Sequence, residues 1–502
     1  MGQVAGLPEL VITLGRRRLG AAETSAVLAV RVSSALGVPT QCMLSWRTDQ
    51  MAGRGLEVAP GDALRVEIGG HREPLFAGEV TVVEFGYGAD LAREVRVRAY
   101  DALHRLRKRQ FTRLHGGADL ADLVDELVAG TGLSVVGARG GTGRVVQGAR
   151  SDLATLVEAC ARANLYPVVV GSTLRLVSLA GEDEEIVLEL GRSLHSAEVE
   201  LSVEPAFRSA EVSGWTADVA ESFSATADDG ARANIRADAA PASVGAGGAL
   251  LRQNASLTTV AQARDLAEAE LDARTVGEAV VDLVADGDPR LRAGRRVRVN
   301  GITAALEGSY TVTSCVHTID GRGYETVLSS RPPAPPPPRS ADMVTLGIVT
   351  DVDDPLRRGR VRVELPAMAP LITPWAPVLV AGAGAAKGAV FLPAPGDRVL
   401  VLLVASDPAD VIVLGGLYGV DEVADAAEPG DRAARFSIRT SDGQLVTLDG
   451  SRHTVRIENG RGSSVELAPD LVRISASSDL LIEAPGRSLR IRAKSVDFEE
   501  AP

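Results

Sequence analysis

The sequence predicts a mainly β protein with a small α/β insertion, and three observations lead to this fold class. Glycine accounts for 52 of the 502 residues and aromatic residues for only 3%, which is typical of aliphatic β-domains with many turns. Apolar and polar residues alternate along much of the chain, with the period of strands that bury one face. Helical spacing is concentrated between residues 111 and 195.

The composition limits the classes of protein that the chain can belong to. A hydrophobic share of 45% and a charged share of 24% indicate a soluble globular protein of several domains. The net charge of −13 argues against a dedicated nucleic-acid binder, whose affinity would come from Lys and Arg on phosphates. Cys42, Cys160 and Cys315 lie far apart, so we expect buried thiols in a reducing compartment. No apolar run approaches the roughly 18 residues of a membrane span, which predicts a chain folded in the cytoplasm without a membrane segment of its own.

Residues 1–110 and 196–330 are predicted to form two similar β-barrel domains. In the first, "PGDALRVEIGG" is followed by "LFAGEVTVVEF" and "EVRVRAYD"; in the second, "AGRRVRVNGI" is followed by "LEGSYTVTSCVH" and "YETVLSSR". Three pairs align the two copies, at offsets of 233, 230 and 230 residues: Gly61 with Gly294, Gly78 with Gly308, and Val97 with Val327. The glycines stand where turns are needed, so the pattern indicates an internal repeat.

Residues 111–195 are predicted to be an α/β insertion. Apolar residues recur at helical spacing at Leu120, Leu123, Val124, Leu127 and Val128, and again at Leu153, Leu156, Val157 and Cys160. Gly130 is expected to stop the first helix, and Ser151 and Asp152 are candidate caps of the second. A small hairpin is expected over 168–177. This arrangement predicts a packing unit without catalytic residues.

Residues 331–341 are predicted to be a proline-rich linker, because consecutive prolines favour an extended spacer. Residues 342–420 contain five or six alternating strands, which suits a small closed barrel of the OB-fold type. Its expected turn and core residues are Gly359, Trp375, Gly396, Asp397, Asp407 and Gly415. Nucleic-acid binding by this barrel is the alternative, but Trp375, Phe391 and Tyr418 are its only aromatic residues and are expected to be packed. A second linker is predicted over 421–434.

The search for chemistry predicts no catalytic, cofactor-binding or metal-binding residue. The six histidines stand singly and no H-E-x-x-H or Cys/His cluster occurs. The "GAGAAKG" stretch at 382–388 lacks the spacing of a phosphate loop, so we interpret it as a flexible connection between strands. The "DVDDP" stretch at 351–355 lacks the Gly and the distal Glu of a calcium loop and is interpreted as an Asp-Pro turn.

Residues 435–502 contain short apolar-x-apolar triplets that begin at 436, 446, 455, 465, 472, 480, 489 and 496. In a strand both apolar members of a triplet lie on one face and the middle member on the other. One chain alone would leave these apolar faces half exposed and the strand edges open. Three chains around a common axis would bury the faces, so a trimeric β-prism is preferred, and a single-chain β-solenoid is the alternative. The expected trimer core is Val465, Leu467, Val472, Ile474, Leu480, Ile482, Leu489, Ile491, Val496 and Phe498.

With these parts in order, the chain resembles the VgrG family of type VI secretion and its relatives in phage baseplates and extracellular contractile injection systems. Residues 1–330 resemble the phage late control protein D hub in "GDPRLRAGRRVRVNGI", "LEGSYTVTSCVHTID" and "GYETVLSSR". Residues 343–420 resemble the baseplate assembly protein V barrel in "GIVTDVDDPLRRGRVRVELP", "WAPVLV", "PAPGDRVLVLL" and "DPADVIVLGGLYG".

The resemblance implies a homotrimer whose two hub domains form a pseudo-hexameric ring on a sixfold inner tube, with the barrel leading to an intertwined trimeric β-helix needle. Implied partners are inner tube proteins, baseplate wedge proteins, a PAAR-type tip protein, effector cargo and, during injection only, the target membrane. The tail has no H-x-H for an apical ion, which favours a separate tip protein, and the expected tip contacts are Phe498, Glu499 and Glu500.

The function expected from these observations is structural, not enzymatic: a hub and membrane-puncturing spike of an extracellular, phage tail-like injection system. The alternatives are a type VI secretion spike and a spike that carries a cell-wall hydrolase. Some relatives carry a lysozyme or effector domain, whereas here only a short linker follows Gly419 and the sequence ends at Pro502. No cofactor and no nucleic-acid partner are expected. The chain is expected to be cytoplasmic when assembled and part of a particle that can be released.

Overall fold

The computed structural model of the chain describes residues 8–47, 58–88, 93–116, 119–138, 140–141, 145–216, 221–228, 249–253, 257, 259–334, 343–368, 371–385, 387–419, 423 and 434–499. Strands dominate these residues and helices are few, which confirms the mainly β class. The chain divides into two compact units, Met1–Leu417 and Tyr418–Pro502.

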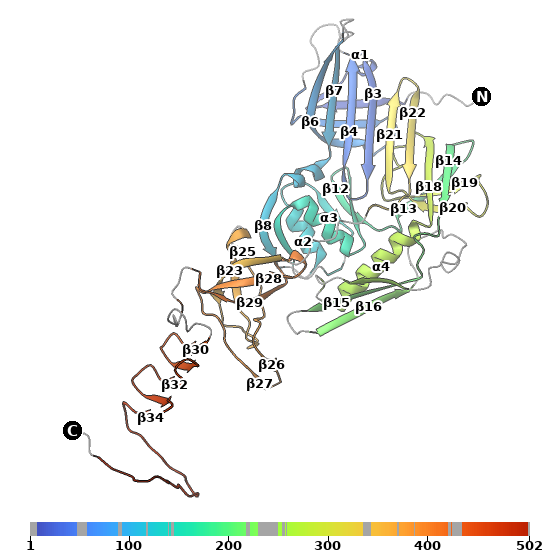
Figure 1. The fold of residues 1–502 in the computed structure, drawn as a ribbon. Coiled ribbons are helices and arrows are strands. Elements are labelled where there is room, and N and C mark those ends of the chain that lie inside the picture. The colour runs from blue at the N-terminus through green and yellow to red at the C-terminus, as the bar shows by residue number, and fades with distance from the viewer. Residues whose placement is uncertain are drawn as a thin grey trace. The chain divides into compact units, whose positions relative to one another are not determined.

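The first hub half is built from an antiparallel sheet that folds over its own core (Figure 1). Buried residues tend to alternate with more exposed ones along its strands, as the period-2 pattern predicts. The elements are β1 (Leu10–Leu14), β2 (Arg17–Arg18), α1 (Ala21–Ser25), β3 (Val27–Ala35), β4 (Val38–Arg47), β5 (Ala63–Ile68), β6 (Phe76–Tyr87) and β7 (Arg93–Tyr100).

The second hub half repeats this arrangement. Its strands are β13 (Glu182–Glu189), β14 (Leu194–Leu201), β18 (Ala279–Asp286), β19 (Arg295–Asn300), β20 (Gly308–Thr311), β21 (Ser314–Asp320) and β22 (Gly323–Ser329). The order β3-β4-β7-β6-β5-β1 in the first half corresponds to β14-β18-β22-β21 followed by β20-β19-β13 in the second. One difference is that β1 lies antiparallel to β5, whereas β13 lies parallel to β19.

Backbone hydrogen bonds align the two halves residue by residue. In the first half the Gly61 N–H donates to the Val80 carbonyl and the Val80 N–H donates to the Asp62 carbonyl, both at 2.8 Å. In the second half the corresponding bonds join Gly294 with Val312 and Val312 with Arg295, also at 2.8 Å. Both glycines have a positive φ, which favours glycine over other residues. The predicted equivalence of Gly61 and Gly294 is therefore confirmed.

The other two predicted equivalences are wrong. Val97 lies on the buried face of its sheet, whereas Val327 lies on the exposed face, so its true counterpart is the buried Leu328. Gly78 lies two residues before Val80 and therefore corresponds to Tyr310, not to Gly308. The aligned stretches share an alternating pattern, and a slip of one or two residues preserves much of that pattern in the sequence.

The two halves share one continuous sheet of eleven strands, in the order β14-β18-β22-β21-β3-β4-β7-β6-β5-β1-β2. The junction between the halves is the antiparallel pair β21 and β3, which runs from Ser314 opposite Ala35 to Asp320 opposite Ala29. Figure 1 shows β21 beside β3 in this sheet. The two predicted barrels are thus joined edge to edge within the chain.

The α/β insertion packs its two helices against a small sheet. Asp119 caps α2 by accepting from Ala121 N–H at 3.0 Å, and Ser151 caps α3 by accepting from Ala154 N–H at 3.2 Å. The predicted apolar faces of both helices are largely buried in one core. The elements are η1 (Ala102–Arg107), β8 (Gln110–His115), α2 (Leu120–Val128), β9 (Ser134–Val136), β10 (Val145–Ser151), α3 (Asp152–Arg162), β11 (Tyr166–Val170) and β12 (Thr173–Val177).

A second insertion, which the sequence did not reveal, lies between β14 and β18. It consists of β15 (Ser209–Thr216), β16 (Glu221–Asp228), β17 (Leu250–Gln253) and α4 (Val260–Val276). The helix packs its alanines and leucines on the three-stranded sheet. The second hub half begins with β13, so the boundary predicted between residues 195 and 196 falls inside β14.

The barrel of the first unit is a five-stranded sheet in the order β25-β24-β23-β28-β29. Two isolated bridges, Val361 with Ala376 and Val378 with Val413, connect its two ends and close it around an aliphatic core. The elements are β23 (Met343–Asp351), β24 (Arg362–Leu365), η3 (Pro366–Met368), β25 (Leu371–Ile372), β26 (Ala383–Gly384), β27 (Lys387–Gly388), β28 (Arg398–Leu403), η4 (Val404–Ser406) and β29 (Val411–Leu417). The OB-fold prediction is confirmed.

The second unit contains an antiparallel meander in which each strand pairs with the next along the chain. Its strands are β30 (Arg435–Arg439), β31 (Leu445–Asp449), β32 (Thr454–Glu458), β33 (Ser464–Leu467) and β34 (Val472–Ser475). The first five predicted triplets therefore lie in strands. Where two neighbouring strands of this sheet meet, their backbone hydrogen bonds are formed within one chain, so these hydrogen bonds need no partner chain. Of the linkers, residues 335–342 and most of 420–433 lie outside the described residues.

Candidate assembly surfaces

The tail sheet carries two apolar rows that cross all five of its strands. The backbone registers place Phe436, Leu448, Val455, Leu467 and Val472 in one row, and Ile438, Val446, Ile457, Val465 and Ile474 in the other. Both rows lie on the same face, because members of a triplet are two residues apart. This face is called the needle face below.

The needle face is open in the single chain. Eight of its ten side chains are 37% to 68% exposed, from Val465 at the lower end to Phe436 at the upper end. The other face carries polar residues such as Arg456, Glu466 and Arg473. An apolar area of this size on a regular sheet is typical of a surface that another chain covers.

The last three triplets form no strand in the single chain. Leu480, Ile482, Leu489, Ile491 and Val496 are more than half exposed, and Phe498 is 93% exposed. The role assigned to these residues in a trimer core stays a prediction. Of the predicted tip contacts, Phe498 and Glu499 are described, and Glu500 lies outside the described residues.

Four of the residues predicted for the turns and core of the barrel lie at turns, and Gly415 lies within β29. Gly359 and Gly396 have φ values of +69° and +95°, a conformation that other L-residues rarely adopt. The Asp397 carboxylate accepts from Ala394 N–H at 2.8 Å within the same turn as Gly396. Asp407 is buried and accepts from Ala409 N–H at 2.9 Å. Gly415 lies at the register shift between β28 and β29, where a β-bulge needs an extra residue.

Trp375 is not a core residue of the barrel. Its ring is partly exposed, and the Arg362 guanidinium lies 5.2 Å from the ring centroid. The core is aliphatic and includes Val363, Val399 and Val401, which are fully buried. Phe391 and Tyr418 are exposed, which differs from the expectation that the three aromatic residues of this segment are packed.

A buried ion pair fixes the first turn of the barrel and was not predicted. The Asp354 carboxylate accepts from Arg360 at 2.7 and 3.1 Å and from the Leu356 and Arg358 N–H groups at 3.1 and 2.7 Å. The Arg360 hydrogen bonds hold the pKa of Asp354 well below its usual range. The "DVDDP" stretch is therefore a turn, as interpreted, with its third aspartate committed to an arginine. Its sequence signal is the Asp-Pro pair followed by Arg360 six residues after the aspartate.

The junction between the hub halves is buried and polar at one point. His317 of β21 donates from Nε2 to the Leu291 carbonyl at 2.8 Å, and its Nδ1 accepts from Tyr324 Oη at 3.1 Å and Thr326 Oγ1 at 3.0 Å. Burial lowers the pKa of His317 to about 4, although the Leu291 hydrogen bond acts in the opposite direction. The ring is therefore neutral at pH 7, and all three contacts suit the neutral form.

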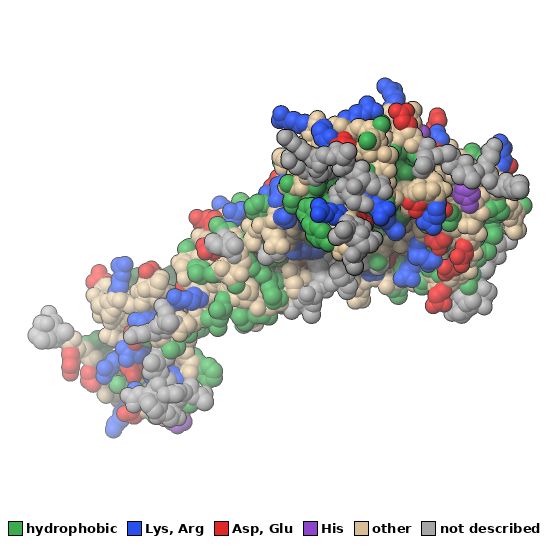
Figure 2. All heavy atoms as spheres, turned by 90° about the horizontal axis from the view of Figure 1, so that it is seen from above, with side chains coloured by type: hydrophobic (Ala, Val, Ile, Leu, Met, Phe, Trp, Pro, Cys, Tyr) green, Lys and Arg blue, Asp and Glu red, His purple; other side chains and the backbone are tan. Residues whose placement is uncertain are grey.

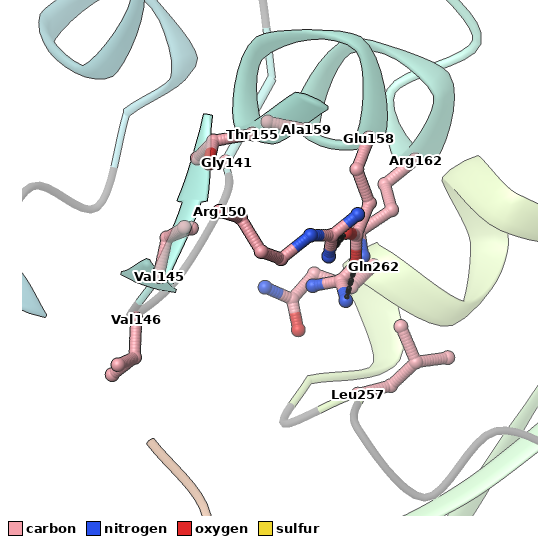
Figure 3. A pocket seen from close by; sticks show the side chains of 10 residues that line it. All are labelled: Gly141, Val145, Val146, Arg150, Thr155, Glu158, Ala159, Arg162, Leu257 and Gln262. Atoms are coloured by element: carbon pink, nitrogen blue, oxygen red, sulfur yellow. Dashed lines mark hydrogen bonds and ion pairs between the residues drawn. The ribbon is translucent and has the colours of Figure 1, made fainter. Parts of the chain in front are cut away.

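A pocket between α3 and α4 is lined by Arg150, Glu158, Arg162 and Gln262, among others (Figure 3). Glu158 bonds both Arg150 and Arg162, the latter at 2.8 Å, so its charge is shared between two guanidinium groups. The lining described here holds no nucleophile paired with a base. Within the described ranges, no three His, Cys, Asp or Glu side chains are grouped closely enough to hold a metal ion.

Two further observations concern the helices and the charged surface. Among the described residues, no helix has both the length and the apolar character that spanning a membrane requires. On the face drawn in Figure 2, Lys and Arg side chains lie interspersed with Asp and Glu side chains.

A comparison with protein families matches the barrel. A family model described as the type VI secretion system/phage-baseplate injector OB domain matches residues 345–418. A search of the curated proteins found no match.

Solved structures match the chain along most of its length. The E. coli c3393 protein, described as a type VI secretion component similar to the T4 tail proteins gp27 and gp5, is 11% identical, with 78% of this chain and 96% of that one covered and a TM-score of 0.50. A chain of the Francisella PdpA-VgrG complex in its half-lidded state is 10% identical, with 94% and 89% covered and a TM-score of 0.54. Residues 345–418 thus match the injector OB-domain family, and the chain as a whole has the fold of VgrG-like hub and spike proteins.

Proposed function

We propose that the chain forms the homotrimeric hub and membrane-puncturing spike of a contractile injection system of the extracellular, phage tail-like kind. Its role is structural and includes no catalytic step. Each chain brings two similar hub halves, so three chains would present six similar units to a sixfold tube. The tail of each chain would then contribute one third of a threefold needle.

The observation that carries the proposal is the open needle face. Fully burying a Val, Leu, Ile or Phe side chain contributes about 1.5 to 3 kcal/mol. Eight needle-face side chains are 37% to 68% exposed, so covering them would contribute about 1 kcal/mol each, or about 8 kcal/mol per chain. Three identical sheets around one axis would cover all three needle faces at once. A flat pair of two sheets would cover two needle faces and would not form a threefold needle.

The proposed partners follow from this role. The hub ring would contact inner tube and baseplate wedge proteins, and the needle would end beneath a PAAR-type tip protein near Phe498 and Glu499. Effector cargo is a further proposed partner, and the target membrane would be met only during injection. The chain would assemble in the cytoplasm, within a particle that can be released.

A type VI secretion spike is the second candidate, because the relatives with TM-scores of 0.50 and 0.54 include a type VI secretion component and a VgrG complex. The two candidates differ in where the assembled particle is found. Fractionation of the producing cells distinguishes them, since a released particle sediments from the culture medium together with sheath and tube proteins. A spike retained in the cells would favour type VI secretion. A spike that carries a cell-wall hydrolase is the remaining alternative, and peptidoglycan cleavage by the purified chain would support it.

The oligomeric state tests the proposal directly. Light scattering of the purified full-length chain is expected to give three times the chain mass of 52.3 kDa. A stable monomer or dimer at micromolar concentration would contradict the threefold needle.

A further inference from the structure

Two strand edges of the hub sheet are unpaired over part of their length. Strand β14 is the end strand of the eleven-stranded sheet, with β18 as its only strand neighbour among the described residues. Strand β6 pairs with β5 only from Phe76 to Glu79, so along the rest of its outer edge, up to Tyr87, no strand of the described residues lies beside it. Open strand edges carry unpaired backbone donors and acceptors that can pair with another chain.

The internal repeat makes these two edges the counterparts of the junction already formed within the chain. Strand β6 corresponds to β20 and β21, and β14 corresponds to β3. The hydrogen-bond match of Val80 with Val312 gives an offset of 232 residues between β6 and β21. In the same alignment Arg98 of β7 corresponds to Ser329 of β22. Across the paired strands, the register leads from Arg98 to Arg31 of β3, and from Ser329 to Glu198 of β14. Arg31 therefore corresponds to Glu198, which gives an offset of 167 residues between β3 and β14.

We propose that residues 83–87 of β6 pair antiparallel with residues 197–201 of β14 in a second copy of this chain, in the register of β21 and β3. This inference rests on the proposed trimer and names the strands that would close its hub ring. The in-chain pairs Cys315–Ser34, His317–Val32 and Ile319–Val30 then become Val83–Leu201, Phe85–Val199 and Tyr87–Ala197 between chains.

The exposed side chains along the two edges fit this pairing. Phe85, Tyr87 and Leu201 are 59%, 77% and 53% exposed, whereas His317 and Ile319, the in-chain counterparts of Phe85 and Tyr87, are buried and Ser34, the counterpart of Leu201, is half-buried. All six side chains that would meet between the chains on the core-facing side are apolar or, for Tyr87, aromatic. Cross-strand pairs of this kind stabilise an antiparallel strand pair more than alanine pairs do.

The same register predicts where two cysteines would cross-link. A hydrogen bond from Leu36 N–H to the Thr313 carbonyl at 2.9 Å extends the in-chain ladder, so the hydrogen-bonded pairs are Ser34–Cys315 and Val32–His317. Ser33–Val316 is then a non-hydrogen-bonded pair, with its side chains close together. Its counterpart between chains is Glu200 with Glu84, and both side chains are exposed.

The experiment compares three pairs of cysteines in the full-length chain. Glu84→Cys with Glu200→Cys tests the junction between chains, and Ser33→Cys with Val316→Cys is the matched pair within one chain. Glu84→Cys with Glu198→Cys is the displaced control on the same face, whose diagonal separation of about 7–8 Å exceeds ordinary disulfide reach. After mild oxidation, denaturing gels without reductant read the covalent state, and light scattering reads the native mass.

The expected result is a reducible ladder of two and three linked chains for the first pair, forming at least about tenfold faster than for the displaced control. The in-chain pair should give a linked monomer only. A native trimer in which the first pair forms no links, or links no faster than the control, would overturn this junction and leave the proposed trimer intact. A native monomer would overturn the proposed trimer itself.

Discussion

Replacing Ile474 by Asp should remove the needle from the trimer. Ile474 lies in the second apolar row and is 60% exposed in the single chain, so its burial by partners contributes about 1.5 kcal/mol. An unpaired carboxylate in its place would lose this contribution and add a desolvation cost of several kcal/mol. In the proposed trimer the three copies would lie at the same level of the axis, so the total loss would be about 15 kcal/mol per trimer. A trimer that is half associated at micromolar concentration is held by about 16 kcal/mol, which is of the same size.

The assay is the denaturant concentration at which the trimer mass is lost, because the hub can hold the three chains together in mild buffer. Ser475→Asp is the matched control, since it places the same charge one residue away on the opposite face of β34. We expect Ile474→Asp to lower the midpoint strongly and Ser475→Asp to leave it close to that of the unchanged chain. A variant with Asp at 474 that resists denaturant as well as the control would refute the packing of the needle face on a shared axis.

Three further predictions concern the hub, the barrel and the end of the tail. Burial lowers the pKa of His317 from 6.5 to about 4, so the stability that the neutral ring supports is present above pH 6.5 and is lost as the pH falls. The loss of folding free energy is about 2 kcal/mol at pH 5. In His317→Gln the denaturation midpoint should therefore change less between pH 7 and pH 5 than in the unchanged chain. Asp354→Asn leaves the buried Arg360 without its carboxylate partner and should destabilise the barrel by about 3 kcal/mol, seen as earlier proteolysis within 343–417, whereas Asp353→Asn, an exposed neighbour, should have little effect. In the trimer the amides of 480–498 should exchange hydrogen more slowly than in isolated chains, and equal exchange in both would mean that the last three triplets form no strands there either.

The class of fold and the strands of the tail could be predicted because both rest on local patterns. Alternating residues such as Val455, Arg456 and Ile457 make one apolar and one polar face wherever they stand, and the structure places them in β32. Turn glycines behave similarly, since Gly61 and Gly294 both have a positive φ that favours glycine whatever surrounds it. These features need no knowledge of distant parts of the chain.

The features that were missed depend on long-range partners or on weak periodicity. Helix α4 buries small residues such as Ala263 and Ala267, whose low hydrophobicity gives little helical signal. The equivalence of Val97 and Val327 was wrong by one residue because an alternating sequence does not say which face is buried. The pair Asp354 and Arg360 looked like an ordinary turn, because burial of a charged pair is a property of the folded barrel.

The sharing of one sheet by the two hub halves also affects how a ring would assemble. On the proposed ring, three of the six junctions form when each chain folds, at a speed that does not depend on protein concentration. Only three junctions remain to be formed between molecules, so ring assembly would depend on the third power of chain concentration, whereas six separate units would require the sixth. Covalent connection of β3 and β21 in one chain would therefore favour complete rings at the low concentrations expected for a component needed in few copies per particle.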